Sequence, residues 1–267
     1  MPKFLSCTDL VADLSEIGVR PGDFVMVHAA MSTVGNLING PDTLIEALMK
    51  TVGATGCVVA YTDWDARYEE LMDGAGRVPD AWRDRVAGFD PMRSRAVRDH
   101  GVFAEFLRTT PGALRSANPG ASMAAIGARA EWLVADHPLD YGYGPGSPLA
   151  KLVEVGGKVL MVGAPRDTMT LIHHAEYLAD IPHKRIKRWE VPFAGPEGTV
   201  WRMSEEFDTS DAVAPQLDGI DYFTAIVTSH LDTGRGRQGR IGTAESLLVD
   251  AREMLEHAVA WLERNGR

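Results

Sequence analysis

The chain has 267 residues, of which 45% are hydrophobic and 24% charged, a composition typical of folded rather than disordered proteins. Its 27 basic and 37 acidic residues give a formal net charge of −10, which argues against nucleic-acid binding and suits a cationic ligand. The sequence has only two cysteines, no signal-peptide pattern and no run of about 18 apolar residues. We therefore expect a cytoplasmic protein without a disulfide framework or a membrane span.

The first part of the chain has the pattern of a β-α-β unit. Residues 5–17 show the apolar spacing of a helix, and residues 23–28 (DFVMVH) predict a strand buried on both faces. The segment 41–53 opens with Pro-Asp-Thr and closes at a glycine, as helices often do. Residues 57–61 (CVVAY) predict a second buried strand.

The alternation of predicted strands and helices continues later in the chain, after segments that lack periodicity. Residues 158–162 predict a third buried strand, followed by a helix over 168–179. The end of the chain, 243–264, predicts a short strand and then an amphipathic helix. Residues 64–101 and 138–148 lack periodicity and indicate long loops. The pattern favours an α/β sheet protein with its site at the carboxyl ends of the strands.

The strongest local signal for chemistry is the segment TLIHHAEYLAD at 170–180. His173 and Glu176 are three residues apart on a predicted helix and therefore project to one side, where His173 could act as a general base. The alternative is that the tandem histidines form a partly exposed face or a hydrogen-bonded core group. A zinc site is a weaker interpretation, because the order His-Glu-x-x-His is absent from His173, His174, Glu176 and His183.

Other catalytic patterns find little support. The segment GPGSP at 144–148 has proline where the nucleophile elbow Gly-x-Ser-x-Gly requires its second glycine. The same segment is also a weak candidate for a phosphate-binding loop, because no predicted strand precedes it. The stretch RGRQGRIG at 235–242 does not match the pyrophosphate loop of GCN5-type acetyltransferases.

Five blocks of sequence nevertheless resemble one family in order and with natural spacing. The similarity covers the chain from about residue 8 onward, and it resembles the aminoglycoside 3-N-acetyltransferases, which are distinct from GCN5-type acetyltransferases. The blocks are VHAAMSTVG (27–35), YTDWDARYEELMDGAG (61–76), RSANPGASMAAIG (115–127), VLMVGAPRDTMTLIHHAEYLADIPHKR (159–185), and SEEFDTSDA (204–212) with GRIGTAESLLVDA (239–251).

The resemblance implies a fold, a reaction and a co-substrate. The fold would be α/β, with a central mixed sheet flanked by helices, as a single domain over 1–267 with a loop-rich insertion at about 64–101. The reaction would transfer an acetyl group from acetyl-CoA to the 3-amino group of 2-deoxystreptamine aminoglycosides, and so confer antibiotic resistance. No metal, nucleic acid or membrane partner would be needed, and the chain would act as a monomer or a homodimer.

The resemblance also assigns roles to individual residues. His173 matches the family's catalytic histidine, and Asp65 and Glu206 match acidic positions that orient it or hold the cationic substrate. The coenzyme would lie near the turn after the first buried strand, which comprises Ala30, Met31, Ser32, Thr33, Val34 and Gly35, with help from Arg115 and Ser116. Negative charge for a polyamine-like sugar would come from Asp65, Glu69, Glu70, Asp90, Glu206 and Asp208.

The sequence departs from the family pattern at two positions, and a third residue stays open. Ala30 stands where the family commonly has serine, and Asn118 stands where many relatives have histidine. Asn118 cannot titrate near neutral pH but can donate a hydrogen bond. His28 ends the first buried strand and suits a site role and a structural role equally. Two alternatives to the main function remain: an acetyltransferase of the same family acting on another small amine, and a non-catalytic binder of cationic drugs.

Overall fold

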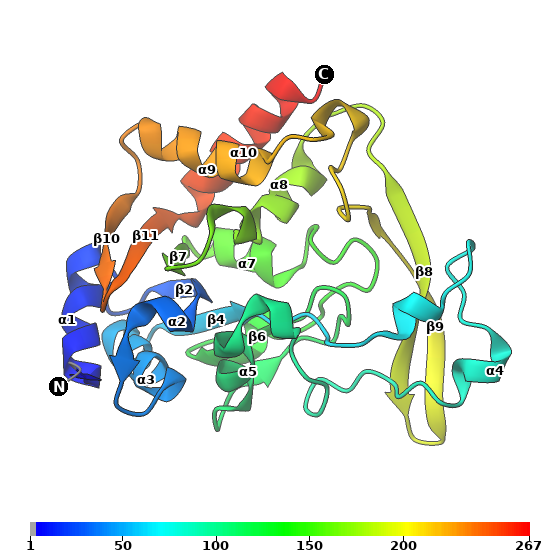
Figure 1. Ribbon diagram of the computed structural model, residues 1–267, viewed down its shortest axis with the longest axis horizontal. Coiled ribbons are helices and arrows are strands. Elements are labelled where there is room, and N and C mark those ends of the chain that lie inside the picture. The colour runs from blue at the N-terminus through cyan, green and yellow to red at the C-terminus, as the bar shows by residue number, and fades with distance from the viewer. Residues whose placement is uncertain (1–3) are drawn as a thin grey trace.

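A seven-stranded mixed sheet forms the centre of the computed structural model, which describes residues 4–267 (Figure 1). The strand order is β10-β11-β7-β2-β4-β6-β5, with β7, β2 and β4 parallel to one another and the flanking pairs antiparallel. The strands are β2 (Phe24–Ala29), β4 (Cys57–Tyr61), β5 (Leu114–Arg115), β6 (Met123–Gly127), β7 (Lys158–Val162), β10 (Arg237–Ile241) and β11 (Ala244–Asp250).

Helices cover both faces of the sheet because the central strands are apolar on both sides. Met26 and Val59 face one core, whereas Val25 and Val58 face the other, as the alternation of strand side chains requires. The first core packs under α6 (Ala130–Val134), α7 (Pro148–Glu154), α8 (Leu171–Leu178), α9 (Tyr222–Asp232) and α10 (Ala251–Asn265). The second packs under α1 (Cys7–Ile17), α3 (Pro41–Val52) and α5 (Val102–Thr109).

The predicted β-α-β unit is present as β2, α3 and β4. The third predicted strand, β7, pairs with the outer side of β2, so that the carboxyl ends of three parallel strands lie side by side. The helix expected over 168–179 is shorter and is preceded by a 3₁₀ turn, η3 (Arg166–Thr168). None of the helices found in residues 4–267 has the length and apolar character that crossing a bilayer requires.

A separate two-stranded hairpin, β8 (Ile186–Gly195) with β9 (Gly198–Phe207), extends from one end of the molecule beside the predicted insertion (Figure 1). The insertion contains η1 (Tyr68–Leu71), α4 (Asp80–Arg83) and η2 (Arg98–His100). Two smaller strands, β1 (Phe4–Leu5) and β3 (Asn36–Leu37), pair near the N-terminus, where the short α2 (Met31–Val34) also lies; the last 3₁₀ turn is η4 (Pro215–Leu217).

Glycines allow the insertion to lie against the backbone of the hairpin. A Cβ atom at Gly88 would fall 2.2 Å from the carbonyl carbon of Phe193, and one at Gly76 would fall 2.2 Å from the carbonyl oxygen of Arg188. Phe89, next to Gly88, forms a β-bridge with Phe193. The backbone of the insertion thus contacts the backbone of the hairpin directly. Any larger residue at Gly76 or Gly88 would prevent this contact.

Candidate active site

Helix α8 carries a histidine paired with a buried carboxylate. The Nδ1 atom of His173 lies 2.6 Å from Oε2 of Glu176, one helical turn further along, and only 1% of the Glu176 side chain is exposed. Because the carboxylate accepts the hydrogen of Nδ1, the lone pair of a neutral His173 is on Nε2. The helical spacing that singled out this pair in the sequence therefore produces an oriented base.

Aromatic rings fix the plane of the His173 imidazole. Tyr143 stacks on it with 4.7 Å between ring centroids, and Phe223 meets it edge-on at 5.0 Å. Its neighbour His174 points elsewhere: its Nδ1 atom lies 2.7 Å from the carbonyl oxygen of Tyr143, and the side chain is buried. The two interpretations of the tandem histidines thus apply to one residue each, with His173 facing the cavities and His174 supporting the loop that holds Tyr143.

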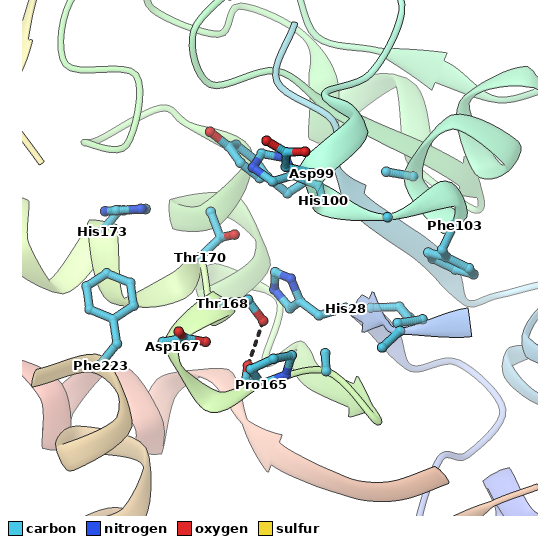
Figure 2. A pocket seen from close by; sticks show the side chains of 17 residues that line it. His28, Asp99, His100, Phe103, Pro165, Asp167, Thr168, Thr170, His173 and Phe223 are labelled. Atoms are coloured by element: carbon cyan, nitrogen blue, oxygen red, sulfur yellow. Dashed lines mark hydrogen bonds between the residues drawn. The ribbon is translucent and has the colours of Figure 1, made fainter. Parts of the chain in front are cut away.

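Two cavities meet at His173, which lines both together with Asp167 and Phe223. The first has a volume of about 340 Å³ and lies at the carboxyl ends of β2, β4 and β7. Figure 2 shows His173 and Phe223 at one side of this cavity, with His28 entering it from β2. The second has a volume of about 680 Å³ and lies along the loop that precedes α9.

The first cavity is mainly apolar but contains two further histidines. Burial lowers the pKa of His28 to about 4, helped by the nearby His100, so that His28 is neutral at physiological pH. The ring of His100 lies 4.8 Å from that of Tyr61, and the Tyr61 hydroxyl lies 2.6 Å from the hydroxyl of Tyr143. Ala30, from the predicted coenzyme turn, also lines this cavity.

The second cavity has an acidic lining. Four aspartates contribute to it, and only one of them, Asp218, is neutralised by the bidentate guanidinium of Arg185, at 2.7 and 2.8 Å. The remaining three leave the cavity negative, which suits a ligand with several ammonium groups; they are Asp167, Asp211 and Asp221.

Two partly buried carboxylates, Asp63 and Glu206, lie close enough to His173 to interact with its charge. Burial raises the pKa of Glu206 to about 6, although backbone N–H groups of Phe207, Tyr143 and Gly142 donate to it. Burial likewise raises the pKa of Asp63 to about 7. For both groups, the pKa would fall again as His173 became positive. Glu206 was among the residues predicted from the sequence, whereas Asp63 was missed.

All of the predicted carboxylates, Glu206 included, lie outside the linings of these two cavities. The Asp65 carboxylate lies 3.8 Å from the guanidinium of Arg98, and its side chain is about one-third exposed. Glu69 pairs with Lys187 at 3.0 Å, Glu70 pairs with Arg67 at 3.5 Å, and Asp90 and Asp208 accept backbone N–H groups from Met92 and Ser210. Their proposed roles toward the substrate stay predictions.

The predicted coenzyme-binding residues fall into two groups. The turn from Ala30 to Gly35 contains α2 and begins at the wall of the first cavity. Arg115 and Ser116, by contrast, are buried. The Arg115 guanidinium donates to Ser122 and to the carbonyl oxygens of Ser94 and Asp63, and so holds the loop after β4 in place.

Two neighbouring polar residues, Ser116 and Asn118, form hydrogen bonds that hold the loops around the site together. The Ser116 hydroxyl lies 2.8 Å from Nδ1 of the buried His137. The Asn118 amide donates to the carbonyl oxygen of Pro138 at 2.6 Å, and its oxygen accepts two backbone N–H groups at 3.0 Å. Asn118 therefore acts as a clamp between loops in this chain, a task that requires no titratable group.

The weaker sequence motifs have structural explanations. Ser147 is the N-cap of α7, where its hydroxyl accepts the N–H of Ala150 at 3.2 Å. In the part of the chain that the structure describes, no three His, Cys, Asp or Glu side chains are grouped closely enough to hold a metal ion.

Comparisons with known proteins agree on one family. The family model described as aminoglycoside 3-N-acetyltransferase matches residues 26–263. Aminoglycoside N(3)-acetyltransferase III of Pseudomonas aeruginosa is 42% identical, over 95% of this chain and 92% of its own length. Aminoglycoside N(3)-acetyltransferase VII of Streptomyces paromomycinus is also 42% identical, over 96% and 91%.

Solved structures give the same result. AAC-IIIb, in a binary complex with CoASH, is 64% identical to this chain with a TM-score of 0.96, and the match covers 98% of this chain and 97% of that one. AAC-VIa bound to sisomicin is 37% identical with a TM-score of 0.94, covering 99% of each chain.

Proposed function

This chain belongs to the aminoglycoside 3-N-acetyltransferase family, and on that premise we propose that His173 is the general base of its reaction. The enzyme transfers an acetyl group from acetyl-CoA to the 3-amino group of an aminoglycoside and thereby confers resistance. The observation that carries the assignment of the base is the His173–Glu176 pair at the meeting point of two cavities. Because acetyl-CoA is a cytoplasmic metabolite, we propose that the enzyme acts in the cytoplasm. We further propose that it acts as a monomer or a homodimer.

The two cavities suit the two substrates. The first is mainly apolar and begins at Ala30, which suits the slender pantetheine arm and the thioester. The second is lined by Asp167, Asp211 and Asp221, which suits a polyammonium sugar. The similar structures that hold CoASH and sisomicin support this assignment of ligand classes.

His173 takes up the proton that the neutral 3-amino group must lose as its nitrogen becomes an amide nitrogen. Its Nε2 atom accepts a proton from the 3-amino nitrogen as that nitrogen forms a bond to the thioester carbonyl carbon. The carbon–sulfur bond then breaks, and the imidazolium returns the proton to the departing coenzyme A sulfur. Glu176 stabilises the transient positive charge through Nδ1, 2.6 Å away. The base is thus restored at the end of each cycle.

Asp63 and Glu206 supply negative charge near His173. Each has a pKa raised toward neutrality by burial, to about 7 and about 6, and a cationic substrate would favour the ionised form of both. We propose that they hold ammonium groups of the aminoglycoside near the base, together with the predicted carboxylate Asp65.

A pair of alanine variants tests the general base. His173→Ala is expected to lower turnover by roughly 10² to 10⁴, the usual contribution of a general base, while keeping its affinity for acetyl-CoA. His174→Ala is expected to be much milder, because His174 hydrogen-bonds a carbonyl oxygen and does not line either cavity. Steady-state kinetics and mass spectrometry of the acetylated aminoglycoside provide the measurement. The opposite ranking of the two variants would remove His173 from this role.

A further inference from the structure

His28 is the one polar residue of the central strand β2, whose sequence is FVMVHA. Phe24 and Met26 face the core under α8, and the alternation of side chains along a strand places His28 on the same side of the sheet. His28 lies at the carboxyl end of β2 and lines the first cavity, as do Thr170 and His173 (Figure 2). The strand therefore presents an imidazole to the cavity that holds the proposed base.

The His28 ring has a nitrogen atom without a partner. Nε2 is enclosed by the protein and forms no hydrogen bond within residues 4–267. Because burial lowers the pKa of His28 to about 4, the ring is neutral near pH 7 and carries a single N–H group. An enclosed polar atom without a partner lowers the stability of a fold, so packing alone does not explain a histidine at this position.

The surroundings of His28 keep positive charge out of the cavity. His100 approaches from η2 and lowers the pKa of His28 further, while burial lowers the pKa of His100 itself. Both rings are therefore mainly neutral at physiological pH. A neutral donor can stabilise negative charge without repelling the positive charge that His173 acquires when it takes up a proton.

We propose that His28 is a further catalytic residue, whose Nε2–H group donates a hydrogen bond to the carbonyl oxygen of the acetyl thioester. The proposal rests on the proposed function, since it places the thioester in the cavity that His173 lines. As the amine nitrogen forms its bond to the carbonyl carbon, the π electron pair of the carbonyl group moves onto oxygen. The pair returns when the carbon–sulfur bond breaks and its electrons leave with sulfur. A donor aimed at this oxygen stabilises the charge while it lasts.

The first test is His28→Leu, which replaces the ring by an apolar side chain. We expect kcat to fall by roughly 10² to 10³, the usual contribution of one such donor. The Kd for CoASH, which lacks the acetyl carbonyl, is expected to stay at the parental value. His28→Gln, which restores an N–H donor, is expected to keep roughly tenfold more turnover than His28→Leu. The melting temperature of His28→Leu should equal or exceed that of the parent, because a polar atom without a partner has been removed.

His230→Leu is the matched control. His230 on α9 is also buried, and neither of its ring nitrogens has a partner within the described residues, but it lines neither cavity. This variant is expected to keep the parental kcat. Equal losses of kcat in His28→Leu and His230→Leu would show that removing a buried histidine disturbs the fold, and would overturn the proposal.

A second readout needs no turnover. Acetyl-CoA labelled with ¹³C at the carbonyl carbon, bound without aminoglycoside, reports through the infrared stretch of that carbonyl group. A hydrogen bond weakens the carbonyl double bond, so we expect a lower frequency in the parent and in His230→Leu than in His28→Leu. An unchanged frequency in His28→Leu would overturn the proposal. Equal weakening of CoASH and acetyl-CoA binding, with no change in frequency, would instead assign His28 to the pantetheine arm and overturn it too.

The two proposals fail separately. If His173→Ala retains turnover, the general base is wrong, while the frequency difference between the parent and His28→Leu still tests the contact to the carbonyl oxygen. If His173→Ala is inactive and the frequency is the same in the parent and His28→Leu, the general base stands and the role of His28 is overturned.

Discussion

Two partly buried carboxylates near His173, Asp63 and Glu206, have pKa values raised to about 7 and about 6, and this determines how they respond to a cationic substrate. Half of the Asp63 population is protonated near pH 7, because burial raises its pKa to about that value. An ammonium group placed beside Asp63 would favour ionisation and release a proton. Binding of the aminoglycoside should therefore be linked to a change in protonation of the protein.

For Asp63→Asn, we expect turnover to fall roughly ten- to a hundredfold, because the charge-assisted contact to the substrate is lost. The variant should also release about half a proton less than the parent on binding aminoglycoside at pH 7. Calorimetry in two buffers of different ionisation enthalpy measures this difference. Asp65→Asn, tested beside it, decides which aspartate of the segment holds the substrate: a larger loss in Asp65→Asn would favour the residue predicted from the sequence.

Residue by residue, the sequence predicted the His173–Glu176 pair but not its whole setting. His173 and Glu176 could be found because a helix fixes the relation between positions three apart. Asp63 and Asp65 look alike in YTDWD, and their difference arises from tertiary structure. Asp63 has a positive φ of 46°, and its carbonyl oxygen is held by Arg115, a partner 52 residues away.

At the scale of elements, the insertion and the hairpin form one unit. The carboxylate of Glu190 on β8 accepts hydrogen bonds from the guanidinium of Arg83, at 2.6 Å, and from the backbone N–H of Val78, at 3.1 Å. Both donors belong to the insertion. This unit positions Glu206 on β9 and the segment that contains Asp63. The sequence predicts a loop-rich insertion at about 64–101, where the structure has η1, α4 and η2 between loops. Without periodicity, the sequence contains no information about the pairing of this segment with β8.

The close approach at Gly88 provides a test of this unit. Gly88→Ala would place a methyl group 2.2 Å from backbone atoms of β8, which cannot move aside as a flexible side chain could. We expect a loss of stability of about 1 to 3 kcal/mol and easier proteolysis of the insertion. Thermal unfolding and limited trypsin digestion measure both effects.

Gly74→Ala is the control for this experiment, because nothing lies within 4 Å of the added atom. It belongs to the same insertion and should keep the parental melting temperature within about 1 °C. Equal behaviour of the two variants would contradict the main-chain contact between insertion and hairpin.

For the molecule as a whole, the buried apolar strands and their flanking helices could be predicted, since their patterns are local. Their order in the sheet could not, because β7 pairs with β2 across more than 120 residues and nothing in either sequence specifies the partner. The hairpin β8–β9 was missed, as its strands mix polar and apolar residues with little alternation.

The whole molecule should also lose stability in acid through its buried histidines. Burial lowers the pKa of His28, His137 and His230 to about 4 each. The unfolded chain binds protons near pH 6.5, so stability is lost as pH falls from 6.5 toward 4, by up to about 3 kcal/mol for each histidine. Asp63, with a raised pKa, opposes this by stabilising the fold as pH falls from 7 toward 4.

Urea unfolding at pH 7, 5.5 and 4.5 measures the balance. We expect the free energy of unfolding to decrease on acidification, and to decrease more steeply in Asp63→Asn, which lacks the opposing group. Parallel curves for the parent and Asp63→Asn would show that the carboxyl of Asp63 titrates at its ordinary pKa in the folded protein.

The meeting of two cavities at His173 has a consequence for inhibitors. One cavity is smaller and mainly apolar, the other is larger and acidic, and they share a wall formed by Asp167, His173 and Phe223. A single molecule that joins a thiol-bearing pantetheine-like arm to an aminocyclitol by a short linker would fill both at once. The second half would then bind at the high effective concentration that the linker sets. Such a compound would bind across the imidazole that we propose as the general base, where a resistance mutation would also lower turnover.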